Sequence, residues 1–180
     1  MVKKILITGA NGFLGSAITK LGIKKGYKVS ILVRKNSNLT NLKSLLSKLK
    51  VHYGNLEDIE SLNQPIKDND VIFHVAADYR LWSRKPAEIY AANVLGTENI
   101  ALKTLTHNKI LIYTSSVATL KLKKDFISDE NSVAKFDDMV GDYKKSKFLA
   151  EKIISSFIKK KKLKGIIVNP STPIGEGDIK

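Results

Sequence analysis

The sequence predicts an α/β fold built on a doubly wound parallel sheet with helices on both faces. Two observations support this prediction. Short apolar segments rich in β-branched residues alternate along the chain with longer segments whose apolar residues recur at helical spacing. The short segments are continuous apolar runs, without the in-and-out alternation of a half-exposed sheet, which is typical of buried parallel strands.

Right-handed crossovers through the helical segments would make all the strands parallel. No repeat and no linker rich in Pro or Ser divides the chain, so residues 1–180 are expected to form one domain. Strands are expected over residues 3–8, 27–33, 50–53, 70–75, 109–114 and 165–169. Helices are expected over residues 13–25, 38–48, 58–63, 87–106 and 138–161.

Composition excludes several classes of protein. With 43% hydrophobic and 27% charged residues among 180, the chain is globular rather than disordered or low in complexity. No apolar run approaches the roughly 20 residues that span a bilayer, and the first residues lack a signal-peptide core. The absence of cysteine excludes disulfides and thiolate catalysis. A cytoplasmic protein without a metal site is the expectation.

The net charge of +14 arises almost wholly from lysine, because only Arg34, Arg80 and Arg84 are arginines. Lysines scattered along a chain are typical of a solvated surface, whereas proteins that read bases favour arginine. No segment combines a basic helical face with base-reading side chains or an aromatic platform. A nucleic-acid partner is therefore not expected.

The first strand leads into the first helix through a glycine motif in which Gly9, Gly12 and Gly15 are each three residues apart. The first glycine permits a tight turn, the second lets a pyrophosphate approach the backbone, and the third lets the helix pack on the strand. The helix N-terminus adds amide donors and a positive dipole. This motif predicts a Rossmann fold that binds a dinucleotide, with contacts from Gly9, Asn11, Gly12, Phe13, Leu14 and Gly15; the alternative is a turn that binds nothing.

Arg34 ends the second strand about 20 residues after the glycine motif. NAD-binding domains place Asp or Glu there for the ribose hydroxyls, whereas Arg accommodates a 2′-phosphate. Arg34 therefore predicts NADP in preference to NAD, unless it is only an exposed loop charge.

Two further groups suggest catalysis. Tyr143 and Lys147 are four residues apart on a predicted helix, so the phenol and the ammonium share a face, and the cation is expected to lower the phenol pKa. Ser115 and Ser116 follow the fifth strand, at the sheet edge where such folds bind ligands. A serine hydroxyl there could hold a carbonyl oxygen while Tyr143 moves a proton. Either serine could instead only bond the backbone.

Together these motifs resemble the extended short-chain dehydrogenase/reductase superfamily, in its NAD-dependent epimerase/dehydratase group. The similarity is closest to bacterial hopanoid-associated sugar epimerases, also described as dihydroflavonol-4-reductase-like. It covers essentially the whole chain, and residues 74–82, 93–99, 113–120, 143–151 and 169–175 carry it.

The resemblance implies that Tyr143 is the acid/base, that Lys147 tunes it and binds the nicotinamide ribose, and that Ser116 rather than Ser115 is the catalytic serine. Residues 78–84 would face cofactor or substrate, or form an ordinary aromatic loop, and His74 is expected to be a core residue. In this family an Asp after the third strand touches adenine, and here Asn55 replaces it. Further cofactor contacts are implied at Asn55, Leu56, Ala76, Ala77, Asn93, Pro170, Ser171 and Thr172.

Family members are roughly twice this length and carry a C-terminal substrate domain, so the chain is expected to be the N-terminal part of such a protein. The resemblance implies a small-molecule substrate and a homodimer through the helices over 87–106 and 138–161, with the oligomeric state left open. The expected activity is that of an NADP-preferring sugar epimerase, with a ketone reductase second. A dinucleotide-binding module without catalysis is the alternative from another class.

Overall fold

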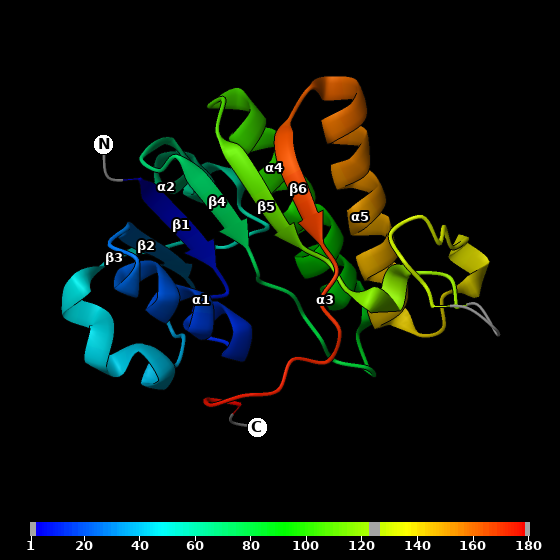
Figure 1. Ribbon diagram of the computed structural model, residues 1–180, viewed down its shortest axis with the longest axis horizontal. Coiled ribbons are helices and arrows are strands. Elements are labelled where there is room, and N and C mark those ends of the chain that lie inside the picture. Colours follow the sequence, from blue (N-terminus) through cyan, green and yellow to red (C-terminus); the bar gives the residue numbers. More distant parts are fainter. Residues whose placement is uncertain (1–2, 123–126, 179–180) are drawn as a thin grey trace.

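The computed structural model describes residues 3–122 and 127–178, and its six-stranded parallel sheet confirms the predicted fold class (Figure 1). The strands lie in the order β3-β2-β1-β4-β5-β6, so the chain reverses direction across the sheet between β1 and β4. Doubly wound folds bind ligands where the order reverses, outside the carboxyl ends of the strands. The strands are β1 (Lys4–Thr8), β2 (Lys28–Val33), β3 (Leu49–Tyr53), β4 (Val71–His74), β5 (Ile110–Thr114) and β6 (Lys164–Val168).

The helices begin and end within about four residues of the predicted positions, with two local differences in helix type. Residues 40–48 form a 3-10 helix, η1 (Thr40–Lys48), instead of an α-helix. A five-residue π-helical segment, η3 (Ala91–Leu95), interrupts the expected long helix. The α-helices are α1 (Phe13–Lys24), α2 (Asn63–Lys67), α3 (Pro86–Tyr90), α4 (Gly96–Thr106) and α5 (Asp142–Lys161), and the shorter 3-10 turns are η2 (Ile59–Leu62), η4 (Val117–Thr119) and η5 (Phe136–Asp138).

Alternate residues of the strands fill two separate cores, as the two-residue period of a strand requires. Ile5 and Ile7 of β1 face the core under α1 and η1, whereas Leu6 faces the core under α4 and α5. Leu111 and Tyr113 of β5 belong to the second core, and both are fully buried. Helix α5, which carries Tyr143 and Lys147, is therefore held against the sheet by apolar packing.

One face of the sheet is only partly covered over its last two strands. Ile110 of β5 is 40% exposed, and Ile166 and Val168 of β6 are 60% and 45% exposed. These residues point away from the α4 and α5 face, since their neighbours Leu111 and Ile167 pack there. The prediction of helices on both faces thus holds for β1 and β2 but not for β5 and β6 within the described residues. No helix in the described ranges is long and apolar enough to cross a bilayer.

Candidate active site

Two glycines of the first loop are required by the fold itself. Gly9 has a φ of +68°, and a Cβ there would lie 2.6 Å from the Cα of Ala76. A Cβ on Gly15 would lie only 2.1 Å from the carbonyl oxygen of Gly9. At Gly12 the nearest atom would be 3.4 Å away, an ordinary contact. The first and third glycines therefore bring β1, α1 and the end of β4 together, while the second leaves open space beside the loop.

The N-terminus of α1 has the chemistry that suits a diphosphate. Gly12 is the N-cap residue and has no side chain with which to cap the helix, and the first turn contains no acidic residue. The amides of this turn, which include those of Phe13 and Leu14, have no acceptor within the helix and lie at the positive end of its dipole. Asn11, just before the cap, is held by Asn41, whose Nδ2 donates to the Asn11 carbonyl at 3.4 Å. The residues present thus fit a dinucleotide.

The residues expected at the adenosine end follow β2 and β3. Arg34 is exposed directly after β2, close enough that its charge contributes to lowering the pKa of Asp78, whose largest influence is a hydrogen bond from Arg80. Asn55 follows β3, and its side-chain oxygen accepts from the Glu57 amide at 3.3 Å. Arg34 and Asn55 therefore both lie at the carboxyl ends of neighbouring strands.

Leu56 and the alanines after β4 lie close to the same edge. A Cβ on Gly96 would lie 2.7 Å from the Cβ of Leu56, so the start of α4 packs directly on this leucine. The amide of Ala76 donates to the Thr8 hydroxyl at 3.3 Å, which joins the ends of β1 and β4. Ala76 and Ala77 are half-buried, with the glycine loop against Ala76.

Asn93 braces the site instead of projecting freely into it. It is 2% exposed, and its side-chain oxygen accepts from the Asp78 amide at 2.7 Å. Its Nδ2 donates to the Asp78 carbonyl at 2.8 Å and to the Ser146 hydroxyl at 2.9 Å. Asn93 lies in the π-helical segment η3, and such segments are frequent at functional sites. The side chain thus ties the loop after β4 to the helix that carries Tyr143.

Ser116 and Tyr143 lie together at the carboxyl edge of the sheet. Ser116 follows β5 and caps the short helix η4, where its hydroxyl accepts from the Ala118 amide at 3.1 Å. Burial raises the pKa of Tyr143, and a hydrogen bond with Ser116 partly opposes the rise. The expected lowering of the Tyr143 pKa by Lys147 is therefore wrong for this structure, in which burial has the largest effect on the phenol. At neutral pH the Tyr143 phenol is protonated.

Lys147 makes different contacts from those expected. It is 2% exposed, and its Nζ donates to the Tyr113 hydroxyl at 2.9 Å and to the Thr114 carbonyl at 2.8 Å. Burial lowers the pKa of Lys147 to about 8, although the charge of Glu151 favours the protonated form. The spacing of four residues does put Tyr143 and Lys147 on the same side of α5, but Tyr113 of β5 receives the ammonium.

Glu151 is a site residue that the sequence reasoning missed. It lies one turn beyond Lys147, and its Oε2 accepts from the hydroxyls of Ser115 and Thr119, the latter at 2.8 Å. The side-chain amide of Asn169, after β6, donates to the same oxygen at 2.9 Å. The helical spacing of Glu151 from Lys147 was a signal, but its donors come from segments far away in the sequence.

The residues after β6 pass along the same edge. The Pro170 carbonyl accepts from the Val117 amide at 3.2 Å, and Ser171 and Thr172 are exposed. The chain then runs back toward α1, as Figure 1 shows in red. There a Cβ on Gly175 would lie 3.5 Å from the Phe13 ring. The strand-end residues expected at the nicotinamide and those of the glycine loop thus belong to one continuous edge.

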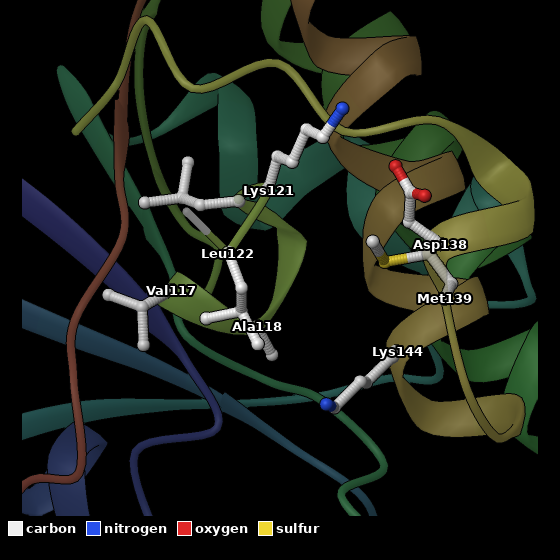
Figure 2. Close-up of a pocket in the computed structure, with 8 residues that line it drawn as sticks. Val117, Ala118, Lys121, Leu122, Asp138, Met139 and Lys144 are labelled. Carbon is white, nitrogen blue, oxygen red and sulfur yellow. The ribbon is translucent and has the colours of Figure 1, made fainter. Parts of the chain in front are cut away.

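A cavity of about 230 Å³ is lined by residues that follow Ser116 and Tyr143 in the sequence (Figure 2). In Figure 2, Val117 and Ala118 lie on one side of the cavity, and Asp138 and Met139 lie on the other. Val117 directly follows Ser116, and Lys144 directly follows Tyr143. The lining residues are Val117, Ala118, Leu120, Lys121, Leu122, Asp138, Met139 and Lys144.

His74 is the core residue that the sequence analysis expected. It is fully buried, and its ring nitrogens form hydrogen bonds with Thr8 at 2.7 Å and Thr97 at 3.0 Å. Its ring stacks on Tyr113 with 5.7 Å between centroids. Burial, with a smaller effect from the charge of Lys147, lowers the pKa of His74 to about 3. His74 is therefore neutral in the folded protein at physiological pH.

We expect His74→Gln to reduce the fall in the free energy of unfolding that occurs as the pH is lowered. Between about pH 6.5 and pH 3 the unfolded chain binds a proton at His74 and the folded chain does not, so lowering the pH favours unfolding. From pH 7 to pH 4.5 the free energy of unfolding of the wild type should fall by about 2 kcal/mol more than that of the variant. Urea unfolding at both pH values measures the difference, and parallel losses would contradict the assignment.

Comparison with known proteins supports the assignment of a doubly wound, dinucleotide-binding type of fold. A model of the NAD dependent epimerase/dehydratase family matches residues 5–180. A putative dihydroflavonol 4-reductase of Synechocystis sp. is 37% identical over 182 residues, which cover 100% of this chain and 52% of that protein. The chain thus spans about half the length of the curated relatives it matches.

Solved structures also match nearly the whole of this chain over about half of their own length. The crystal structure of gox2253 is 40% identical and superposes with a TM-score of 0.91, covering 98% of this chain and 53% of that one. Yeast methylglyoxal/isovaleraldehyde reductase Gre2, solved with NADPH, has a TM-score of 0.78 over 93% of this chain and 57% of its own. At 21% identity the likeness to Gre2 concerns the fold alone.

Proposed function

Because the chain belongs to the NAD dependent epimerase/dehydratase family, we propose that it is the dinucleotide-binding part of an NAD(P)-dependent oxidoreductase. The observation that carries the proposal is the juxtaposition of Ser116, Tyr143 and Lys147 at the carboxyl edge of the sheet, to which the glycine loop also belongs. A module that only bound dinucleotides would need the loop but not a buried ammonium and a phenol beside it. The activity is proposed for a whole protein of this family, and the chain spans about half the length of the curated relatives it matches.

The glycine loop and the strand ends would bind different parts of the dinucleotide. The first turn of α1 would bind the diphosphate, Arg34 and Asn55 the adenosine end, and Lys147 the nicotinamide ribose. Pro170, Ser171, Thr172, Ala76 and Ala77 would line the ring, and Asn93 would support them through Asp78. When bound, the nicotinamide supplies or takes up the hydride.

Tyr143 would act as the proton donor in the direction of ketone reduction. Its raised pKa keeps the phenol protonated, which is the form that can give a proton to a carbonyl oxygen as the carbonyl carbon becomes an alcohol carbon. Ser116 would donate a hydrogen bond to the same oxygen and hold it near the phenol. In the reverse direction the Tyr143 phenolate would remove the hydroxyl proton.

The substrate would bind in the cavity beside these residues. Its walls are apolar at Val117, Leu122 and Met139, and they also carry the charged side chains of Lys121, Asp138 and Lys144. This lining suits a hydroxy or keto compound with an apolar part. Reduction is favoured by the protonated state of Tyr143, while a sugar epimerase of the hopanoid-associated type stays the second candidate, because it begins with the same transfer in reverse and the family model includes epimerases.

NADP is the preferred cofactor in this proposal, because Arg34 is exposed where a 2′-phosphate would lie. Calorimetric titration of the chain with NADPH and NADH at two salt concentrations is the test. We expect NADPH to bind at least about 10-fold more tightly, and Arg34→Ala to remove most of this ratio. Lys24→Ala, which removes an exposed charge at the opposite end of α1, is the control.

The titration has three outcomes that would contradict the proposal in whole or in part. Equal affinity of the wild-type chain for both dinucleotides would overturn the preference for NADP. Binding of neither by a chain that is folded by circular dichroism would overturn dinucleotide binding by this chain. Equal loss of affinity in Arg34→Ala and Lys24→Ala would mean that the attraction comes from the overall charge and not from Arg34.

A further inference from the structure

Glu151 is a carboxylate at the centre of the candidate site, and its hydrogen-bond donors in the described chain are all neutral. The hydroxyls of Ser115 and Thr119 and the amide of Asn169 donate to one oxygen, Oε2. Hydrogen bonds to a charged acceptor are stronger than those between neutral groups. The donors come from the end of β5, from η4 and from the segment after β6. Glu151 therefore fastens three segments of the site to α5.

The segment that Glu151 fastens is the one that carries Ser116. The Ser116 carbonyl accepts from the hydroxyl of Thr119 at 2.7 Å and from the amide of Asn169 at 3.0 Å. The same hydroxyl and amide also lie within hydrogen-bond distance of Glu151, so the single hydrogen of the Thr119 hydroxyl is shared between the carboxylate and the Ser116 carbonyl. Ser116 in turn interacts with Tyr143, which lies on the helix of Glu151. The loop and the helix are thus held in register at the place where the serine must meet the phenol.

Glu151 also acts on Lys147, although it does not bind the ammonium. The two direct acceptors of Lys147, Tyr113 and Thr114, are both neutral. The titratable groups that face this ammonium are His74 of β4, Tyr113 of β5 and Glu151 of α5. His74 and the Tyr113 phenol are uncharged at neutral pH, so Glu151 is the one among them that carries a negative charge.

We propose that Glu151 is a positioning residue that keeps Lys147 protonated and holds the Ser116 segment against α5. The inference rests on the proposed function, in which Lys147 and Ser116 act on cofactor and substrate. It adds a residue that touches neither. The carboxylate would perform both tasks because one of its oxygens binds the loop while its charge lies one helical turn from the ammonium.

The test is a titration of the Lys147 ammonium by NMR in the wild-type chain and in Glu151→Gln. The resonance is assigned by its loss in Lys147→Met. The pKa of Lys147, about 8 in the wild type, should fall by at least about half a unit in Glu151→Gln, because glutamine keeps the shape and loses the charge. Amide exchange of Ala118 and Thr119 should also become faster. Glu98→Gln, which removes an exposed charge from α4, should change neither.

An unchanged Lys147 pKa in a folded Glu151→Gln variant would overturn the proposal. If that variant does not fold, the wild-type chain provides a second test of the coupling. The NMR chemical shift of the side-chain carboxyl carbon of Glu151, followed against pH, should show a step at the titration midpoint of Lys147. Absence of the step would overturn the coupling. These measurements need no dinucleotide, so failure of the wild type to bind NADPH would count against the proposed function and leave the role of Glu151 to be judged separately.

Discussion

Tyr143→Phe is expected to lower turnover by about 10³-fold or more while the affinity for the dinucleotide changes less than about 2-fold. The change removes only the phenolic oxygen, which is the group that would give a proton to the carbonyl oxygen, and general acid catalysis is worth about 10² to 10⁴ in rate. Consumption of NADPH in the presence of a panel of ketones measures turnover, and calorimetry measures dinucleotide binding.

Tyr27→Phe provides a matched control for this loss. Tyr27 lies between α1 and β2, at the end of the sheet away from the site, and it is 41% exposed. It should leave both turnover and affinity unchanged. If Tyr143→Phe keeps the turnover of Tyr27→Phe, the phenol is not the proton donor. A loss of dinucleotide affinity in step with turnover would instead place Tyr143 in cofactor binding alone.

The fold and the glycine loop could be predicted because their causes are local. Gly9, Gly12 and Gly15 lie within seven residues, between a strand and a helix that each carry their own hydrophobic pattern. All six strands form within one residue of the predicted positions at each end. Alternation of apolar strands and amphipathic helices is enough to predict a parallel sheet.

The interior of the candidate site could not be predicted in the same way. The spacing of Tyr143 and Lys147 gives a shared side of a helix, but the contact of Lys147 with Tyr113 joins residues 34 apart in the sequence. Only the packing of α5 on β5 determines that this phenol, and not Tyr143, receives the ammonium. The π-helical segment that places Asn93 between Asp78 and Ser146 likewise has no local sequence signal.

Burial also reverses an electrostatic expectation. From the sequence alone a nearby cation should lower a phenol pKa. In the folded chain the pKa of Tyr143 is raised and that of Lys147 is lowered to about 8, because burial disfavours the charged form of each. The site therefore holds a protonated acid beside an ammonium that titrates close to neutral pH.

Gly12→Ala and Gly15→Ala are expected to separate dinucleotide binding from folding. At Gly15 a Cβ would lie 2.1 Å from one backbone atom and 2.9 Å from another, and neither can move aside as a side chain could. Alanine gains about 1 kcal/mol in helix propensity over glycine, but overpacking against backbone costs about 3 kcal/mol or more. Gly15→Ala should therefore lower the free energy of unfolding by about 2 kcal/mol, measured by urea unfolding.

Gly12→Ala should behave in the opposite way, although it is the same chemical change in the same loop. The added Cβ meets no atom of the chain closer than 3.4 Å, and the φ of −79° is accessible to alanine, so stability should change by less than about 1 kcal/mol. The methyl group would instead occupy the space through which a diphosphate reaches the amides of α1. NADPH affinity should fall at least about 10-fold by calorimetry. Full affinity in a stable Gly12→Ala chain would mean that the diphosphate does not bind at this loop.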